Sequence, residues 1–200
     1  MSINLLTKFL PEHTLPYLKK WFGSYRIHIH IARDRHSKLG DYIKLPDDSH
    51  KITLNSTLKP ELFFFVLTHE LAHLLAFEKF GRRIPPHGKE WKLTFGNMIL
   101  ESLPVYKEEA RPLLIKFSKS PKANFMASED LVRYFRPEPE TTDGVYIENL
   151  AMGEEFIYRK QVYKLIEKRK KNYLCQNLST DKKYMFKSVT LVQRKKQNGE

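Results

Sequence analysis

Residues 60–80 read PELFFFVLTHELAHLLAFEKF, and this stretch decides the fold. Its apolar residues cover nearly every side of a helix, which is typical of a helix buried in a core rather than lying on a surface. Capping residues at 55–57 precede it, Pro60 is tolerated in a first helical turn, and Gly81 can end it. The sequence therefore predicts a long central helix over about 60–80.

The middle of this helix carries an H-E-x-x-H pattern, His69-Glu70-Leu71-Ala72-His73. Residues four apart lie one above the other on a helix, so the two imidazoles can share one metal ion. Glu70 lies close enough to reach a water molecule on that metal without coordinating it, which is the place of a general base. The alternative is that the histidines only hydrogen-bond within the core. We favour the metal because it would satisfy two imidazoles and a carboxylate that are costly to bury without partners.

A catalytic zinc takes three protein ligands and keeps a fourth position for water, so a third ligand is needed. The metzincin pattern is excluded, because the residues three and six positions beyond the second histidine are Ala76 and Lys79 instead of glycine and histidine. We prefer His87, since the prolines before it and the glycine after it can fix its loop so that the ring turns back over the helix. The carboxylate alternatives are Glu90, Glu101 and, less favoured, Glu78.

The same residues carry a resemblance to a known family. The segment VLTHELAH at 66–73, followed after 13 residues by HGKEW at 87–91, resembles the SprT family of zinc metalloproteins, which includes the Spartan-type DNA-protein crosslink proteases. Upstream, SKLG at 37–40 resembles the family's Ser-x-x-Gly segment, and ITLN at 52–55 resembles its strand entering the metal helix. The similarity covers roughly residues 20–105.

This resemblance implies that His69, His73 and His87 are zinc ligands. It also implies that Glu70 is the catalytic base, that the fold is zincin-like, and that the substrates are proteins, often near DNA. The chain departs from many SprT-like proteins at its C-terminal end. A zinc ribbon with four cysteines cannot form, because Cys175 is the one cysteine of the sequence.

Composition sets the broad class and setting of the protein. Of 200 residues, 41% are hydrophobic and 29% are charged, which is enough to bury a core. The 35 Lys and Arg against 23 Asp and Glu give a net charge of +12, which favours polyanionic partners, with nucleic acid first. The single cysteine excludes a disulfide framework and favours a reducing compartment. Since no signal-peptide pattern opens the chain and charged residues interrupt its most apolar stretch, we expect a cytoplasmic protein without a membrane span.

The pattern along the chain predicts an α+β fold with two parts. We place an SprT-like zinc metallopeptidase domain at 1–136, a linker at 137–144, a small basic β module at 145–193 and a polar tail at 194–200. In the first domain the other predicted elements are a helix near 4–23 broken around Pro11, strands at 26–31 and 52–54, a turn at 37–41, a helix from 87, and more helix at about 106–134. The module's short apolar and aromatic runs predict a small barrel-like all-β fold. These runs are at 156–158, 162–166, 173–175, 184–186 and 189–192.

The β module carries most of the positive charge. From residue 151 onward there are thirteen Lys and Arg against five Asp and Glu, an excess of +8. Aromatic residues are interleaved with these cations and could stack on bases. A solvated sheet face with the aromatics turned inward is an equally good interpretation.

The leading functional hypothesis is a zinc-dependent metallopeptidase in which Glu70 activates a metal-bound water against a peptide carbonyl. Its partners would be a protein substrate and, through the basic module, DNA or another polyanion. The residue stabilising the oxyanion is left open among Tyr42, Arg35 and Arg133. The alternatives are a metal-braced nucleic-acid-binding protein without protease activity, and a zinc hydrolase acting on a small amide.

Four further side chains have simpler interpretations. His28 and His30 are expected on an exposed strand face, and His36 on a solvated loop. Trp91, four residues after His87, is expected to pack behind that ligand instead of binding substrate.

Overall fold

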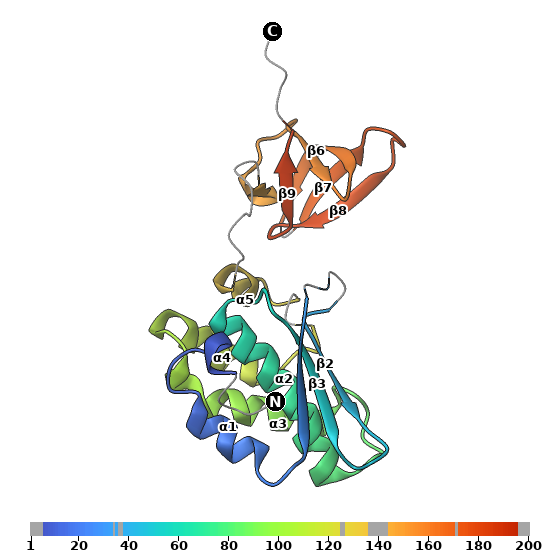
Figure 1. Ribbon diagram of the computed structural model, residues 1–200. Helices are drawn as coiled ribbons and strands as arrows, with labels where there is room; N and C mark the ends of the chain where they lie inside the picture. The colour runs from blue at the N-terminus through green and yellow to red at the C-terminus, as the bar shows by residue number, and fades with distance from the viewer. Residues whose placement is uncertain are drawn as a thin grey trace. The chain divides into compact units, whose positions relative to one another are not determined.

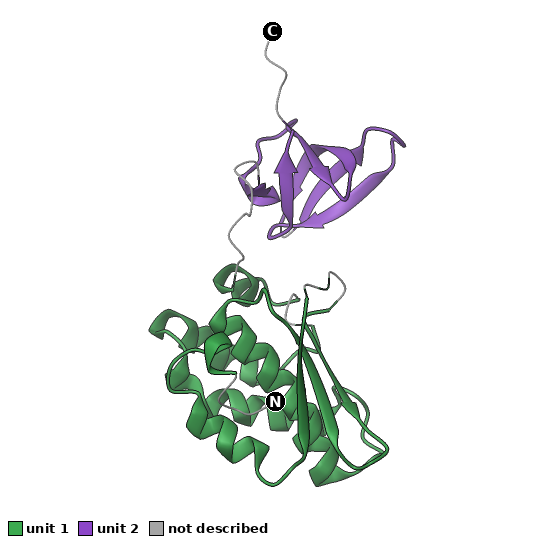
Figure 2. Cartoon of the chain, viewed as in Figure 1, with its two compact units in different colours: residues 1–135 green, residues 136–200 purple. Residues whose placement is uncertain are grey.

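The structure is a computed structural model of the chain, and it describes residues 6–33, 35, 38–124, 127–135, 144–170 and 172–195. The chain divides into two compact units, Met1–Phe135 and Arg136–Glu200 (Figure 2). The first unit mixes helices with a small sheet, and the second is built on an all-β sheet. The predicted linker, apart from Gly144, lies outside the described residues, as do positions 196–200 of the predicted tail and His36.

Unit 1 contains a three-stranded sheet that supports the central helix. The sheet has the order β1-β3-β2, formed by β1 (Ile27–Ala32), β2 (Gly40–Lys44) and β3 (His50–Asn55). β1 runs parallel to β3 and β2 antiparallel to it, so β2 is an edge strand. His28 and His30 are exposed on β1, as predicted. The predicted turn at 37–41 is wrong for Gly40 and Asp41, which belong to β2 because pairing with β3 overrides their low strand propensity.

The predicted central helix is α2 (Pro60–Phe80), and its length and burial are confirmed. Phe63, Phe64, Leu67 and Leu71 are all 0% exposed along it. α2 packs against β2 and β3 on one side and against α3 (Lys89–Glu101) on the other, as Figure 1 shows. It is the one helix among the described residues with the length and composition to cross a membrane, but 67% of its apolar 18-residue stretch is buried inside the unit, as in a core helix.

The remaining helices of unit 1 cover the α2 side of the sheet. The predicted N-terminal helix is broken near Pro11, into a 3-10 turn, η2 (Thr7–Phe9), and α1 (Leu15–Phe22). Further helix is present between 106 and 134, as predicted, and it is divided into short pieces. Short 3-10 turns, η3 (Leu103–Val105) and η4 (Glu108–Ala110), precede α4 (Arg111–Ser118), and α5 (Glu129–Tyr134) follows a break. Pro121 lies in that break and cannot continue a helix.

Unit 2 is a six-stranded antiparallel sheet in the order β4-β9-β5-β6-β7-β8. Its strands are β4 (Gly144–Tyr146), β5 (Glu155–Tyr158), β6 (Gln161–Arg169), β7 (Asn172–Asn177), β8 (Lys183–Lys187) and β9 (Leu191–Arg194), with a 3-10 turn, η6 (Ile147–Asn149), after β4. Phe156, Leu165 and Cys175 are at most 1% exposed and form its core.

The sheet of unit 2 curls strongly. β5 and β8 are separated by two strands, so in a flat sheet they would be about 14 Å apart. The rings of Tyr158 on β5 and Phe186 on β8 nevertheless lie 5.2 Å apart. The module is thus rolled toward a barrel, although β4 and β8 remain the two edges of the sheet.

Candidate metal centre

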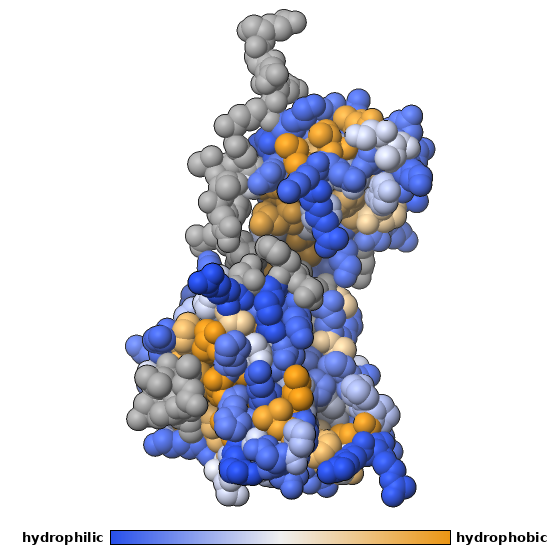
Figure 3. Space-filling view, turned by 45° about the vertical axis from the view of Figure 1, so that its right-hand side comes forward, coloured by the Kyte–Doolittle hydropathy of each residue, from blue (hydrophilic) through white to orange (hydrophobic). Residues whose placement is uncertain are grey.

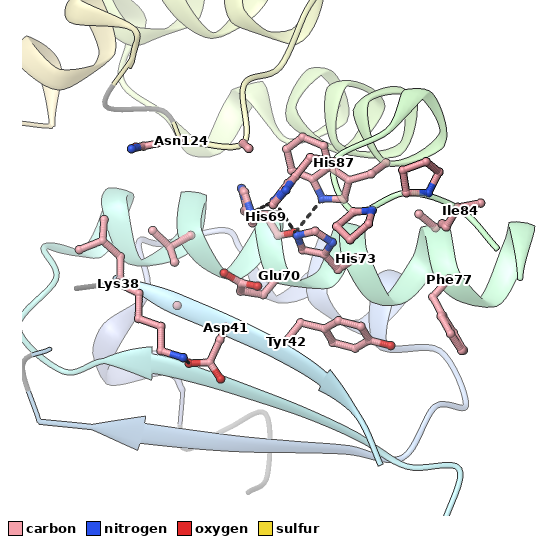
Figure 4. A pocket seen from close by; sticks show the side chains of 18 of the residues that line it. Lys38, Asp41, Tyr42, His69, Glu70, His73, Phe77, Ile84, His87 and Asn124 are labelled. Carbon is pink, nitrogen blue, oxygen red and sulfur yellow. Dashed lines mark hydrogen bonds and ion pairs between the residues drawn. The ribbon is translucent and has the colours of Figure 1, made fainter. Parts of the chain in front are cut away.

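Three histidines meet at one point beside α2. The Nε2 atom of His87 lies 3.0 Å from Nε2 of His73 and 3.2 Å from Nε2 of His69 (Figure 4). Among the described residues, these three side chains form the group whose donor atoms, within 4.8 Å of one another, could hold a metal ion. Nitrogens at about 2.0–2.1 Å around a tetrahedral zinc are roughly 3.3 Å apart, so the observed spacing suits such an ion.

The loop before α3 delivers His87 to the pair. The Gly88 N–H donates to the Pro85 carbonyl over 2.9 Å, which closes a tight turn around His87. His87 itself takes a left-handed conformation, with φ 58°. Non-glycine residues adopt this region rarely, and they do so chiefly where the surrounding structure holds them. The turn therefore serves to aim the imidazole back at α2.

Trp91 supports all three imidazoles, in line with its predicted packing role. Its ring centroid lies 4.7 Å from that of His69, 5.3 Å from that of His73 and 4.6 Å from that of His87. The indole Nε1–H donates to the His69 carbonyl over 3.4 Å. At 1% exposure, Trp91 forms the floor of the site.

Burial keeps these imidazoles neutral. Desolvation, followed by the neighbouring imidazoles, lowers the pKa of His69 to about 3 and that of His73 to about 4. Desolvation also lowers the pKa of His87. Neutral imidazoles have free lone pairs, and three of them pointing at one spot cannot all be satisfied by hydrogen bonds to one another. A cation that accepts three nitrogen lone pairs resolves this, so the donor set fits zinc.

Glu70 lies next to this group with its carboxyl group buried. Glu70 is 6% exposed, and burial raises the pKa of its carboxyl to about 8. The Asp41 carboxylate raises the pKa further, while Arg35 and Lys38 act in the opposite direction. A carboxyl group whose pKa lies near neutrality is suited to accept and return a proton.

Tyr42 braces the site from β2. Its ring stacks against His73 at a centroid distance of 6.1 Å and an interplanar angle of 3°. On its other side it contacts His50, whose Nδ1 lies 3.1 Å from the Tyr42 hydroxyl. Glu78 Oε1 lies 3.2 Å from the Lys44 ammonium and 3.5 Å from His50 Nε2. These contacts give Tyr42 a supporting role and engage its hydroxyl away from Glu70, as Figure 4 shows.

The other candidate residues are engaged elsewhere. Arg35 donates to Asp41 and, over 2.8 Å, to Asn55 Oδ1. Arg133 lies 3.9 Å from Glu129 on α5 and does not line the cavity. Two of the carboxylate alternatives for the third ligand have close partners: Glu101 accepts from Lys20 and Trp21, and Glu78 pairs with Lys44. Glu90 Oε1 lies 3.8 Å from Lys89, and its buried Oε2 has no hydrogen-bond partner among the described residues.

A cavity of about 810 Å³ opens over the histidines and Glu70. Its walls come from β2, from the loop 82–87 and from the segment 123–124. Asn124 and Lys38 are polar residues on these walls that sequence reasoning missed, because an isolated asparagine in a loop and one lysine among many carry no pattern. Folding alone brings them to the site.

The part of the sequence that contains the three histidines and Glu70 is similar to known proteins. The SprT-like family model matches residues 14–107. Protein SprT of Shigella boydii serotype 18 is 48% identical over 56 residues, and Protein SprT of Cronobacter sakazakii is 51% identical over 49 residues. Protein SprT of Escherichia coli strain K12 is 46% identical over 56 residues.

These matches are local. They cover 22–26% of this chain and 29–33% of the relatives, so the matched part spans about a third of the curated proteins' length. No solved structure matches the chain. The family match includes all three histidines and Glu70, and it ends before unit 2 begins.

Proposed function

Because residues 14–107 place the chain in the SprT-like family, we propose that it is a zinc-dependent metallopeptidase with a zincin-like catalytic domain. The observation that carries this proposal is the convergence of three neutral imidazoles next to a buried carboxyl group at the floor of a cavity. His69, His73 and His87 would hold the zinc. Asn124, on the cavity wall, is a candidate to stabilise developing negative charge.

The roles of the protein's own groups follow from their positions. When bound, zinc supplies Lewis acidity and makes water easier to deprotonate at neutral pH. Glu70 would accept the proton at its carboxylate and return it to the leaving amine. Trp91 and Tyr42 would hold the imidazoles in place, and the apolar floor would exclude bulk water.

The shape of the site favours a peptide over a small amide. β2 is an edge strand, and its residues Gly40, Asp41 and Tyr42 line the cavity. An edge strand offers backbone N–H and C=O groups that can pair with an extended chain. A peptide lying along β2 would bring its carbonyl groups past Glu70 and the three histidines.

Metal removal and restoration test this proposal. We expect the zinc-loaded full chain to cleave dye-labelled casein, the chelator-treated chain to be inactive, and added zinc to restore cleavage. A small-amide hydrolase would instead leave casein intact and cleave acetylated amino-acid amides. Casein cleavage that persists in the metal-free chain would refute metal-dependent hydrolysis.

We propose a second function for unit 2, the binding of nucleic acid. Lys164 on β6 and Lys183 on β8 flank Gln176 of β7 in register, so all three lie on one face of the sheet. Both lysines are exposed, and neither forms an ion pair with another described residue. By contrast, Arg194 and Lys195 are paired with Glu154 and Glu155. The view in Figure 3 shows a mostly hydrophilic surface on this unit, broken by apolar patches.

Salt-dependent binding tests this second function with matched variants. We expect the full chain to bind a fluorescent 20-nucleotide DNA with an affinity that falls steeply with salt. Replacing Lys164 and Lys183 by glutamine should lower the salt slope by about 1–2, because two phosphate contacts are lost. The control replaces Arg194 and Lys195 by glutamine. It removes the same amount of positive charge, but from side chains that are already paired with Glu154 and Glu155. Equal effects of the two double variants, or no binding at low salt, would refute this surface.

A further inference from the structure

Gly40 on β2 lies directly against the carboxyl group of Glu70. A Cβ atom built at Gly40 would be 2.8 Å from Glu70 Oε1 and 3.1 Å from Glu70 Cγ. It would also be 2.7 Å from Cγ1 of Val66, one turn earlier on α2. Contacts under 3.0 Å are essentially never made by real Cβ atoms, so any side chain at position 40 would force a neighbour to move.

The backbone conformation does not explain why glycine is present. The described glycines with positive φ are Gly23, Gly81 and Gly153, so Gly40 has a backbone that other residues can adopt. It pairs with Leu54 as an ordinary residue of β2. The requirement for glycine at this position is therefore the close approach of β2 to Glu70 and Val66, and not a special turn.

Both chain neighbours of Gly40 are held in place by hydrogen bonds or ion pairs. Leu39 accepts a backbone hydrogen bond from Asn55 over 3.0 Å, and the carbonyl of Lys38 accepts from Asn55 Nδ2 over 3.1 Å. On the other side, Asp41 is held by Arg35 and by Lys38, whose ammonium lies 3.0 Å away. β2 cannot retreat from the helix without breaking these bonds.

The helix is equally fixed. The flanking residues Leu67 and Leu71 of α2 are 0% exposed and lie in the close-packed core. If neither backbone can move, the cheapest response to a Cβ at position 40 is a shift of the flexible end of Glu70. The fold would survive, and the carboxyl group would be displaced.

We infer that Gly40 is a positioning residue that sets where the Glu70 carboxyl group lies over the three histidines. The close approach of β2 confines that carboxyl group on its sheet side. The inference rests on the proposed function for its catalytic consequence, since Glu70 is the base of that proposal. The steric contact itself can be tested without any activity.

The test compares Val66→Ala with the double variant Gly40→Ala/Val66→Ala in the full chain. Val66→Ala removes the competing clash, so that in the double variant the added methyl group meets Glu70 alone. We expect a crystal structure of the double variant to show Oε1 moved by about half an ångström or more, from 2.8 Å toward the ordinary contact distance of 3.4 Å. We expect kcat on dye-labelled casein to fall about 10- to 100-fold, since misplacement on the order of 1 Å can cost about that much.

A positioning role differs from a purely structural one in what the substitution leaves intact. If Gly40 only positions Glu70, the double variant should retain the parent's KM and one zinc per chain, and Val66→Ala alone should keep the parent's kcat. An unmoved Glu70 carboxyl group, or an undiminished kcat in the double variant, would overturn the inference. If the parent chain leaves casein intact, the proposed function fails, and the crystallographic position of Oε1 still decides whether Gly40 places Glu70.

Discussion

Replacing Glu70 by glutamine should abolish hydrolysis and, at the same time, stabilise the metal-free protein. Glutamine has nearly the same size but is neutral, so it keeps the packing against Gly40 and removes the titrating group. As a general base, Glu70 should increase the rate of hydrolysis by a factor of about 10²–10⁴. Zinc binding should persist, because the three imidazoles are unchanged.

The stability gain follows from the raised pKa of Glu70. Burial raises this pKa from 4.5 to about 8, so between these values the folded protein keeps a proton that the unfolded chain releases. The stability of the metal-free protein therefore falls as the pH rises from about 4.5 to about 8. At 1.36 kcal/mol per pH unit, the loss by pH 7 is about 3 kcal/mol. Glu70→Gln removes this loss, and at pH 4.5 the variant and the parent should be nearly equal in stability.

Thermal unfolding of the chelator-treated proteins at pH 4.5 and pH 7 measures this difference. We expect Glu70→Gln to raise the midpoint of unit 1 by about 10 °C at pH 7, on the usual scaling for a domain of this size. Glu78→Gln is the matched control on the same helix, because Glu78 is 27% exposed and ion-paired, and we expect it to give no gain. Equal midpoints for Glu70→Gln and the parent at pH 7 would refute the buried, protonated carboxyl group. Undiminished casein cleavage by Glu70→Gln would refute its role as the base.

Three further predictions concern the supporting groups. In the Glu70→Gln background, the metal-free protein should lose stability as the pH falls from 6.5 toward 4, by about 3 kcal/mol for each of His69 and His73. The reason is that these histidines are protonated in the unfolded chain but stay neutral when buried in the folded protein. Denaturant titrations that give the same stability across this pH range would contradict their burial. Trp91→Leu should weaken zinc binding about 10- to 100-fold by calorimetric titration, as expected when ligand orientation is lost; unchanged affinity would show that the indole is not needed to place the imidazoles. Burial raises the pKa of the Cys175 thiol to about 12, so iodoacetamide should label it at pH 8 only in the unfolded chain; rapid native labelling, read by mass spectrometry, would contradict the burial of that strand.

Much of unit 1 could be predicted because its central helix is apolar on nearly every side. A helix with apolar residues on nearly every side must be buried to keep them from water, and α2 is buried as expected. The H-E-x-x-H spacing then places two imidazoles on one face, and the stiff Pro85-Pro86-His87-Gly88 segment suggested the third. The structure brings these three side chains together, while their roles as ligands remain a prediction.

The rest depends on tertiary contacts that a linear pattern does not contain. Gly40 and Asp41 are poor strand formers, so the sequence predicts a turn there, and pairing with β3 is what makes them part of a strand. The close approach of Gly40 to Glu70 arises only when β2 packs on α2. The hydrogen bond between Tyr42 and His50 and the position of Asn124 on the cavity wall likewise have no signature in the sequence.

The zinc content of His87→Ala tests the central claim most directly. The parent chain, loaded and then dialysed, should hold one zinc per chain by mass spectrometry of the metal. His87→Ala should lose it, whereas His30→Ala, which removes an exposed histidine from β1, should keep it. If His87→Ala retained one zinc with unchanged affinity, the three-imidazole centre would be contradicted. The third zinc ligand would then have to be a carboxylate such as that of Glu90.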